Sequence, residues 1–188
     1  MAGSGTTVDV CKEEDRRVIG YDIAPQHPEV IQNDARSIPL DAESVDMVFI
    51  DSPYGDNVKY SENPDCIGRI SCEEGQFYDE LEKVAQEIYR ILKPGKVMAW
   101  LIGDQWVKKR FTPVGFKLYG MLCKYFETVD IVVVARRGQS SHTGVWHNRA
   151  KRFNFYLRGF KYLFIMRKPY AEDTAAKKTN KVEWAKYK

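Results

Sequence analysis

The chain has 188 residues, of which 44% are hydrophobic and 29% charged, and its formal net charge is +3. This length and composition suit one α/β domain and exclude a disordered tail or a fibrous repeat. The longest apolar runs, at 45–50 and 131–135, are much shorter than the roughly 18 residues of a membrane-spanning helix, so we expect a soluble protein with no membrane partner.

Targeting and metal signals are absent from the sequence. The first residues lack the basic and apolar regions of a secretory signal, which makes the cytoplasm the expected location. The four cysteines have no Cys-x-x-Cys spacing, and only three histidines accompany them. We therefore expect neither disulfides nor a metal site.

Short β-like runs alternate with helical stretches in the first half of the chain, which is typical of a parallel sheet covered by helices. A helix is predicted over 4–15 and a strand over 17–23. The continuous apolar run 45–50 predicts a strand buried on both faces. Apolar residues recur at steps of three and four between 77 and 91, which predicts a helix, with a candidate capping box at 71–74 and an end at Lys93-Pro94-Gly95.

The second half of the chain continues the same pattern. Strands are predicted over 96–102, 129–135 and 160–166, and a helix runs from Thr112-Pro113 to Tyr125. We expect Phe160, Tyr162 and Phe164, on the last strand, in the core. The segment 136–159 lacks clear periodicity and predicts a long functional loop or a small insertion, here called the basic aromatic loop. The predicted organisation is one domain over 1–170 and a Lys-rich tail over 171–188.

The first candidate site is the turn Ala2-Gly3-Ser4-Gly5-Thr6-Thr7, together with Asp22 at the end of the following strand. A Gly-rich turn lets backbone N–H groups and a helix N-terminus approach a ligand, and an acid at the next strand end can accept bonds from ribose hydroxyls. The alternative interpretation is an ordinary turn.

The second candidate site is Asp51-Ser52-Pro53-Tyr54, which directly follows the strand at 45–50. Ligands bind at this edge of the sheet in open α/β folds. A carboxylate and a backbone carbonyl can accept both hydrogens of a planar amino group, while the Tyr54 ring stacks on the base that carries it. The alternative is a strand-terminating turn with a surface tyrosine.

The third candidate site is a stretch of positive charge. Residues 131–171 contain nine Lys and Arg and no acid, whereas residues 1–130 contain 23 acids and 15 bases. Such a segment attracts a polyanion, most simply a nucleic acid, although a solvated rim around core aromatics is the alternative. The predicted nucleic-acid contacts are Arg136, Arg137, Arg149, Lys151, Arg152 and Arg158.

The first two motifs, in this order and each at a strand end, resemble the amino-methylating DNA methyltransferases, which modify adenine N6 or cytosine N4. The resemblance covers roughly residues 1–168 and is most specific at 51–54. Asn33-Asp34-Ala35 matches the place where that family contacts the adenine of its cofactor, and 89–95 matches the helix-to-strand turn typical of class I methyltransferases. The resemblance implies a class I, Rossmann-like α/β fold with a mostly parallel sheet and helices on both faces.

The resemblance also implies S-adenosyl-L-methionine as cofactor and DNA as substrate. Asp51, Ser52, Pro53 and Tyr54 would be catalytic, and the cofactor would contact Ala2, Gly3, Ser4, Gly5, Thr6, Asp22, Ile23, Asp34, Ala35 and Asp51. The leading acid favours adenine N6, because cytosine-N4 members more often begin this motif with serine. The alternatives are a cytosine-N4 enzyme, an RNA guanine-N2 methyltransferase and a non-catalytic nucleic-acid-binding subunit of a split methyltransferase.

Two features depart from the family pattern. Family members usually have a central strand immediately before the Gly-rich turn, and this sequence begins at the turn. We expect a second polypeptide or another copy of the chain to supply that strand, because a gap in a sheet leaves backbone groups unpaired. Ser52 stands where proline is commoner; the family uses the carbonyl of this residue, so serine should serve.

Overall fold

The computed structural model describes residues 1–107, 110–136 and 144–170, and the predicted tail lies outside this part of the chain. No described helix is long and apolar enough to cross a membrane. In chain order the elements are α1 (Thr6–Glu13), β1 (Gly20–Asp22), β2 (Val30–Gln32), β3 (Val45–Asp51), the short 3-10 helix η1 (Ile67–Arg69), α2 (Gly75–Ile91), β4 (Leu92–Ile102), β5 (Gln105–Val107), β6 (Arg110–Thr112), α3 (Val114–Leu122), β7 (Glu127–Ala135), α4 (Gly144–Phe153) and β8 (Phe160–Arg167).

The strands form three separate sheets. The largest has the order β3-β4-β8-β7, with β3 parallel to β4 and with β8 antiparallel to both of its neighbours. β1 and β2 form a parallel pair, and β5 and β6 form an antiparallel hairpin that the sequence did not predict. Because β8 alone is reversed in the largest sheet, β3, β4 and β7 all end at the same edge.

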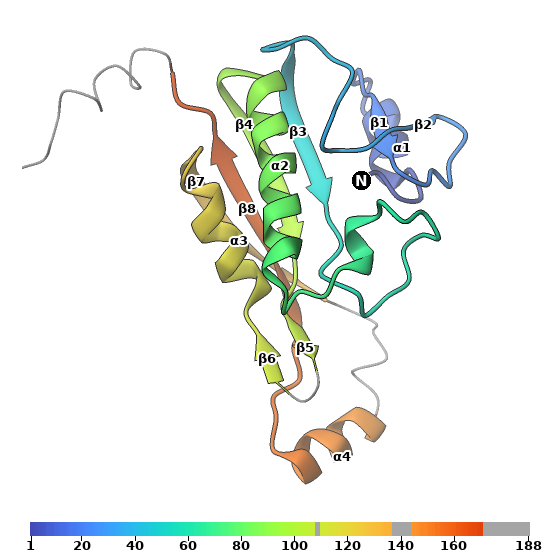
Figure 1. Cartoon of the computed structure of the whole chain (residues 1–188), viewed down its shortest axis with the longest axis vertical. Coiled ribbons are helices and arrows are strands. Elements are labelled where there is room, and N and C mark those ends of the chain that lie inside the picture. The colour runs from blue at the N-terminus through green and yellow to red at the C-terminus, as the bar shows by residue number, and fades with distance from the viewer. Residues whose placement is uncertain (108–109, 137–143, 171–188) are drawn as a thin grey trace, which may run out of the picture.

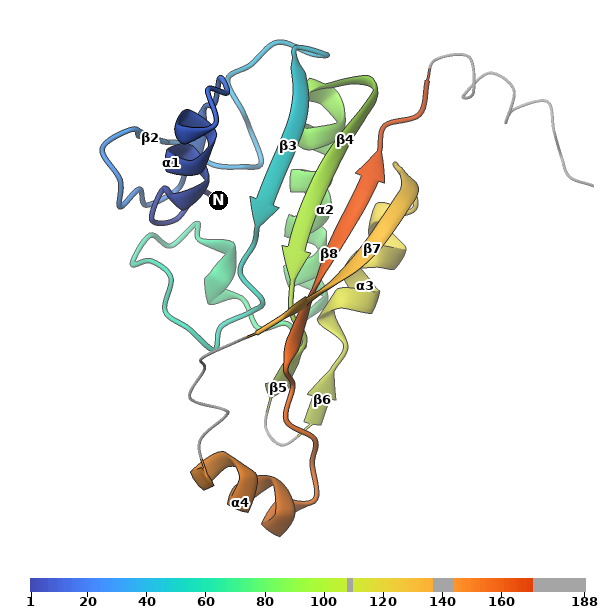
Figure 2. The ribbon, with the colours of Figure 1, turned by 180° about the vertical axis from the view of Figure 1, so that it is seen from behind.

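The core lies between the four-stranded sheet and α2. Leu81 and Ile88 on the helix are at most 1% exposed, as is Trp100 on β4, and Phe164 on β8 is 3% exposed. Figure 1 shows α2 and α3 in front of this sheet, and Figure 2 shows α1 beyond its β3 edge, beside β1 and β2. The apolar periodicity that predicted α2 therefore marks the main packing face of the domain.

The ends of α2 differ from the prediction. Glu74 is the N-cap and makes no side-chain capping bond, so the expected capping box at 71–74 is not formed. The chain passes from Ile91 directly into β4, which includes Lys93-Pro94-Gly95. Gly95 has a φ of 75°, a value that favours glycine, so the chain turns within the first part of the strand instead of in a separate loop.

β3 is not buried on both faces, and the prediction of its burial is wrong. Ile50 is 5% exposed, but Met47 and Phe49 are 58% and 43% exposed. β3 is an edge strand of its sheet, and Figure 2 shows that the face away from α2 has no helix over it in the described part of the chain. Phe160 is likewise 39% exposed and is not a core residue, whereas Phe164 is.

The β1–β2 pair is joined to the rest of the domain by polar contacts with α2. Arg36 donates to Glu80 at 2.5 Å, and the backbone N–H of Ile38 donates to Glu87 at 2.7 Å. Arg90 donates to the carbonyl of Ile38 at 2.8 Å. No strand pairing links β1 to β3 among the described residues, so these hydrogen bonds and the packing of Met1 and Ala35 on the core hold the two parts together.

The chain that leaves β3 is fixed to the core by Trp100. The indole Nε1–H of Trp100 donates to Oγ of Ser52 at 2.9 Å. Both residues are buried, at 0% and 2% exposure, and a buried N–H requires an acceptor. The serine hydroxyl supplies an acceptor that the commoner proline could not, which gives a structural reason for this departure from the family pattern.

Replacing Ser52 with alanine should destabilise the fold by about 1–3 kcal/mol, because the buried indole N–H loses its partner. Denaturant unfolding would measure this as a lower midpoint with an unchanged slope. The penalty should shrink in a Trp100→Phe background, which has no N–H to satisfy. An equal penalty in both backgrounds would show that the hydrogen bond contributes nothing.

Candidate functional site

A cavity of about 960 Å³ lies at the carboxyl ends of β1, β3 and β4. It is lined by residues of the Gly-rich turn, of both parallel strand pairs and of the two ends of the basic aromatic loop, Arg136 and Arg158, here called its neck. It therefore brings together segments that are far apart in sequence. The predicted site residues that line it are Ala2, Gly3, Ser4, Thr6, Asp22, Ile23, Asp34, Ala35, Asp51, Ser52, Pro53, Tyr54, Arg136 and Arg158.

Asp22 closes the Gly-rich turn from the end of β1. One carboxylate oxygen accepts the backbone N–H of Gly3 at 2.9 Å, and the other accepts that of Ala24 at 2.9 Å. Gly5 has a φ of 84° at the start of α1, and a Cβ there would lie 2.4 Å from His27. Gly5 thus shapes the turn from behind, while Gly3 and Asp22 face the cavity.

Asp34 and Ala35, after β2, extend this side of the cavity. Arg36 donates to both carboxylate oxygens of Asp34, with the shortest contact at 2.5 Å. Burial alone would raise the pKa of Asp34, but the hydrogen bonds from Arg36 outweigh it and hold that pKa below its ordinary value. Asp22 and Asp34 give this half of the cavity two acceptors for hydroxyl or amino groups of a ligand.

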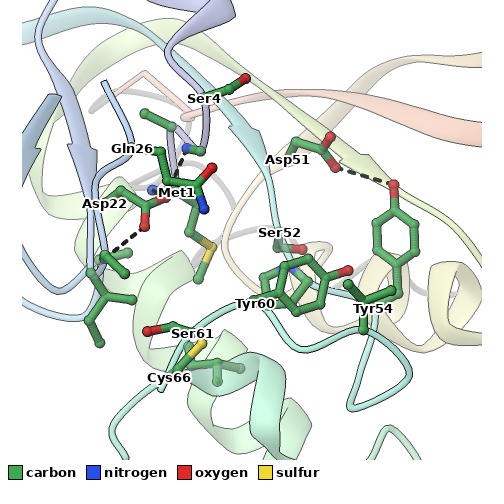
Figure 3. Close-up of a pocket in the computed structure, with 18 of the residues that line it drawn as sticks. Met1, Ser4, Asp22, Gln26, Asp51, Ser52, Tyr54, Tyr60, Ser61 and Cys66 are labelled. Atoms are coloured by element: carbon green, nitrogen blue, oxygen red, sulfur yellow. Dashed lines mark hydrogen bonds and ion pairs between the residues drawn. The ribbon is translucent and has the colours of Figure 1, made fainter. Parts of the chain in front are cut away.

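Asp51 and Tyr54 form the opposite side (Figure 3). The hydroxyl of Tyr54 donates to Oδ1 of Asp51 at 3.2 Å, and Nζ of Lys161 lies 3.5 Å from Oδ2. The Asp51 side chain is 45% exposed and lines the cavity. Burial first, and the charge of Asp51 second, raise the pKa of Tyr54, so its hydroxyl stays protonated and remains a donor. A carboxylate and an aromatic ring are thus both available to a ligand.

The cations of the basic aromatic loop fall into two groups. Arg136 and Arg158 lie at its neck, where the backbone N–H of Arg136 donates to the carbonyl of Gly159 at 2.7 Å. Nε of Arg136 and Nη1 of Arg158 are buried and have no hydrogen-bond partner in the described structure. Burial lowers the pKa of Arg158. Both guanidinium groups line the cavity, where their positive charge would attract an anion.

The second group lies on α4, outside the cavity. Arg149 sits 5.1 Å from the ring centroid of Trp146, and Arg152 sits 5.5 Å from that of Phe153. Lys151 is on the same helix and exposed. Arg137 lies outside the described residues. The structure therefore separates the predicted nucleic-acid contacts into a neck pair and a helix, which the sequence presented as one segment.

The sequence did not reveal several other residues that line the cavity. Asn57 and Tyr60 come from the loop after Tyr54, and Asp104 and Lys161 come from the end of β4 and the start of β8. They carry no local motif, and only the pairing of β4 with both β3 and β8 brings the last two near Asp51. Among the described residues, no cluster of His, Cys, Asp or Glu could hold a metal ion.

The sequence and the fold both match known proteins. A model of the DNA methylase family matches residues 45–188, and no curated protein matches the sequence. A candidate DNA modification methylase of Thermus thermophilus, complexed with S-adenosyl-L-methionine, superposes with a TM-score of 0.50 and 22% identity over 72% of this chain and 53% of that chain.

Two further solved structures share the fold. The PvuII DNA methyltransferase, described as cytosine-N4-specific, gives a TM-score of 0.51 and 14% identity over 69% of this chain and 44% of its own. A SAM-dependent methyltransferase of Methanosarcina mazei superposes with a TM-score of 0.55 and 14% sequence identity, and the match covers 90% of each chain. The chain spans about half the length of the Thermus and PvuII proteins.

These matches confirm the predicted class I methyltransferase fold of the α/β class. The family match includes the motif from Asp51 to Tyr54 and the strands and helices that position it. Because the family model covers more than half of the sequence, we conclude that this chain belongs to the DNA methylase family of amino-methyltransferases.

Proposed function

We propose that this chain is an S-adenosylmethionine-dependent DNA methyltransferase that modifies an exocyclic amine. The observation that carries the proposal is one cavity with two unlike walls. Asp22 and the Gly-rich turn form one wall, and Asp51 with the ring of Tyr54 forms the other. Family membership and the cofactor-bound Thermus structure support the same activity.

The residues present fit the cofactor. Gly3 has a positive φ of 53° and open space where a Cβ would stand, so its backbone can approach a ligand closely. Asp22 is held by two backbone N–H groups and keeps lone pairs for ribose hydroxyls. Asp34 lies nearby, where the family contacts the adenine. When bound, S-adenosylmethionine supplies an electrophilic methyl group on a sulfonium.

The chain contributes position and charge to the transfer. Asp51 and the carbonyl of Ser52 accept the two hydrogens of the target amine, which aims the nitrogen lone pair at the methyl carbon, and Tyr54 stacks on the base. A cofactor held by Gly3, Asp22 and Asp34 would supply the methyl group to this nitrogen and would leave as the neutral thioether. The surplus proton passes from the methylated nitrogen to Asp51 or to water, so no strong base is needed.

Adenine N6 is the favoured target. The acid that begins the motif at Asp51 supports this choice, because serine is commoner there in cytosine-N4 members. The similarity to the PvuII enzyme makes cytosine N4 the second candidate. Nucleosides from DNA treated with the protein, separated by mass spectrometry, distinguish N6-methyladenine from N4-methylcytosine.

We assign the DNA contacts to both groups of cations. Arg136 and Arg158 suit a phosphate near the target nucleotide, because both arginines line the cavity. The arginines of α4 pair with aromatic rings on an acid-free helix, which suits backbone contacts farther along the strand.

A partner strand completes the proposal. β1 and β3 belong to separate sheets, and backbone groups of β3 that point away from β4 have no strand partner in the described structure. An extended segment of a second polypeptide, or of another copy of this chain, would pair with these groups.

Asp51→Ala should lower the rate of methyl transfer to DNA by at least about a hundredfold, because the amine loses the acceptor that orients it. Cofactor affinity, measured by calorimetry, should fall far less than the rate, since Asp22 and Asp34 keep their expected contacts with the cofactor. Asp46→Ala, in an exposed position on the same strand, is the matched control and should retain the rate. Turnover of Asp51→Ala at the control rate would contradict the proposed role.

Removing two α4 charges with Arg149→Ala and Arg152→Ala should reduce the salt dependence of DNA binding, by about one unit of slope for each phosphate that the helix no longer neutralises. Fluorescence anisotropy at several salt concentrations measures this slope. Lys93→Ala with Lys96→Ala removes the same charge at the amino end of β4, away from the cavity. Equal slopes for the two double variants would exclude α4 from the DNA contact.

Hydrogen exchange should detect the missing pairing partner. In the isolated chain, the amides of β3 that point away from β4 should exchange at least about tenfold faster than those bonded to β4. β4 is bonded on both sides and is the internal control. Binding of the partner segment should protect the fast amides; full protection of β3 in a monomer would remove the need for a partner.

A further inference from the structure

Lys161 reaches Asp51 across the four-stranded sheet. Lys161 lies near the start of β8 and Asp51 at the end of β3, with β4 between these strands. Its Nζ lies 3.5 Å from Oδ2 of Asp51 and 5.1 Å from the centroid of the Tyr54 ring. The lysine side chain is 21% exposed and lines the cavity. The ammonium is therefore at the target-base wall of the site.

These two contacts match those that the proposed reaction gives to the target amine. The amine donates to Asp51 while its base lies over Tyr54, and in the free protein the ammonium of Lys161 does both. An ammonium and an amino group are nitrogen donors of similar size. Lys161 thus holds the place of the amine and keeps Asp51 ion-paired until a base arrives.

The neighbouring carboxylate, Asp104, has other described partners than Lys161. Asp104 accepts the backbone N–H of Gly115 at 2.9 Å with one oxygen and the hydroxyl of Tyr162 at 3.1 Å with the other. Among the described contacts of Lys161, the ion pair is therefore with Asp51. A base that donates to Asp51 would displace the ammonium of Lys161 from this carboxylate. The ammonium would stay near Asp51, because the backbone of Lys161 is fixed in β8.

We propose that Lys161 then donates to the ring nitrogen beside the target amine and so determines which bases are accepted. This inference rests on the proposed function. Adenine has the acceptor N1 next to its amine, and cytosine has N3. On the pairing edge of both bases, the amine would donate to Asp51 and the neighbouring ring nitrogen would accept from Lys161. Guanine has a donor, N1–H, at this place on its pairing edge, so the ammonium would disfavour it.

Base analogues with single atoms removed test this contact. Wild type, Lys161→Met and Lys161→Arg are compared in single-turnover methylation of a duplex that the wild type methylates, with adenine, 1-deazaadenine or 7-deazaadenine at the target position. 1-Deazaadenine lacks N1, and its methylation by the wild type should be about ten- to a hundredfold slower than that of adenine. For Lys161→Met, which lacks the donor, the two rates should differ by no more than about threefold. Lys161→Arg keeps a donor and should restore the discrimination.

Two controls separate this contact from other causes. 7-Deazaadenine keeps N1 and should affect all variants equally. Lys124→Met removes a lysine that pairs with Glu82 on the helical side of the domain and should behave as the wild type. If the methylated base is cytosine, 3-deazacytosine replaces 1-deazaadenine.

The outcomes separate failure of this inference from failure of the proposed function. Equal discrimination against 1-deazaadenine by the wild type and Lys161→Met would overturn the contact while leaving the methyltransferase activity intact. If Lys161→Met instead removed a rate difference between adenine and 7-deazaadenine, the ammonium would contact the N7 edge of the base. That result would also overturn the proposed contact with N1. No methylation of DNA by the wild type would remove the proposed function, and this inference with it.

Discussion

The parallel pairing of β3 with β4 is the constraint on which the rest of the site depends. Its register places Asp51 beside Leu101, so both strands end at the same edge of the sheet. The buried bond from Trp100 to Ser52 then fixes the first residue beyond β3 to the core, and Pro53 keeps Ser52 out of the helical region. Asp51 and Tyr54 reach the cavity because the core and the proline direct the chain there.

Helix α2 connects the two walls of the cavity. Its apolar side packs against the sheet that carries Asp51, while Glu80, a buried residue beside that apolar side, accepts a bond from Arg36. Arg36 also binds Asp34, which lies in the wall proposed for the cofactor. The distance between the two walls is therefore set by a helix and a few charged hydrogen bonds. Such charge-assisted bonds are roughly twice as strong as neutral ones.

The sequence predicted what depends on local pattern and missed what depends on distant pairing. The apolar spacing of α2 and the motif at 51–54 were readable because their residues are neighbours on a helix or at one strand end. The burial of β3 could not be predicted, because an apolar run does not reveal whether both faces of a strand are covered. Phe49 is exposed because one face of β3 is uncovered in the described part of the chain. Lys161 lies 110 residues from Asp51, and only the position of β8 beside β4 joins them.

Charge is arranged across the cavity in the order that the proposed reaction needs. Asp22 and Asp34 face one half, where Arg36 pairs with Asp34 and the N-terminal ammonium of Met1 lies 4.0 Å from Asp22. Arg136, Arg158 and Lys161 face the other half, where a nucleic-acid backbone would be attracted. Asp51 lies at the boundary and is paired with Lys161. In the proposed reaction the cofactor and the target base would bind at opposite walls, so that the amine and the methyl group would approach each other from either side.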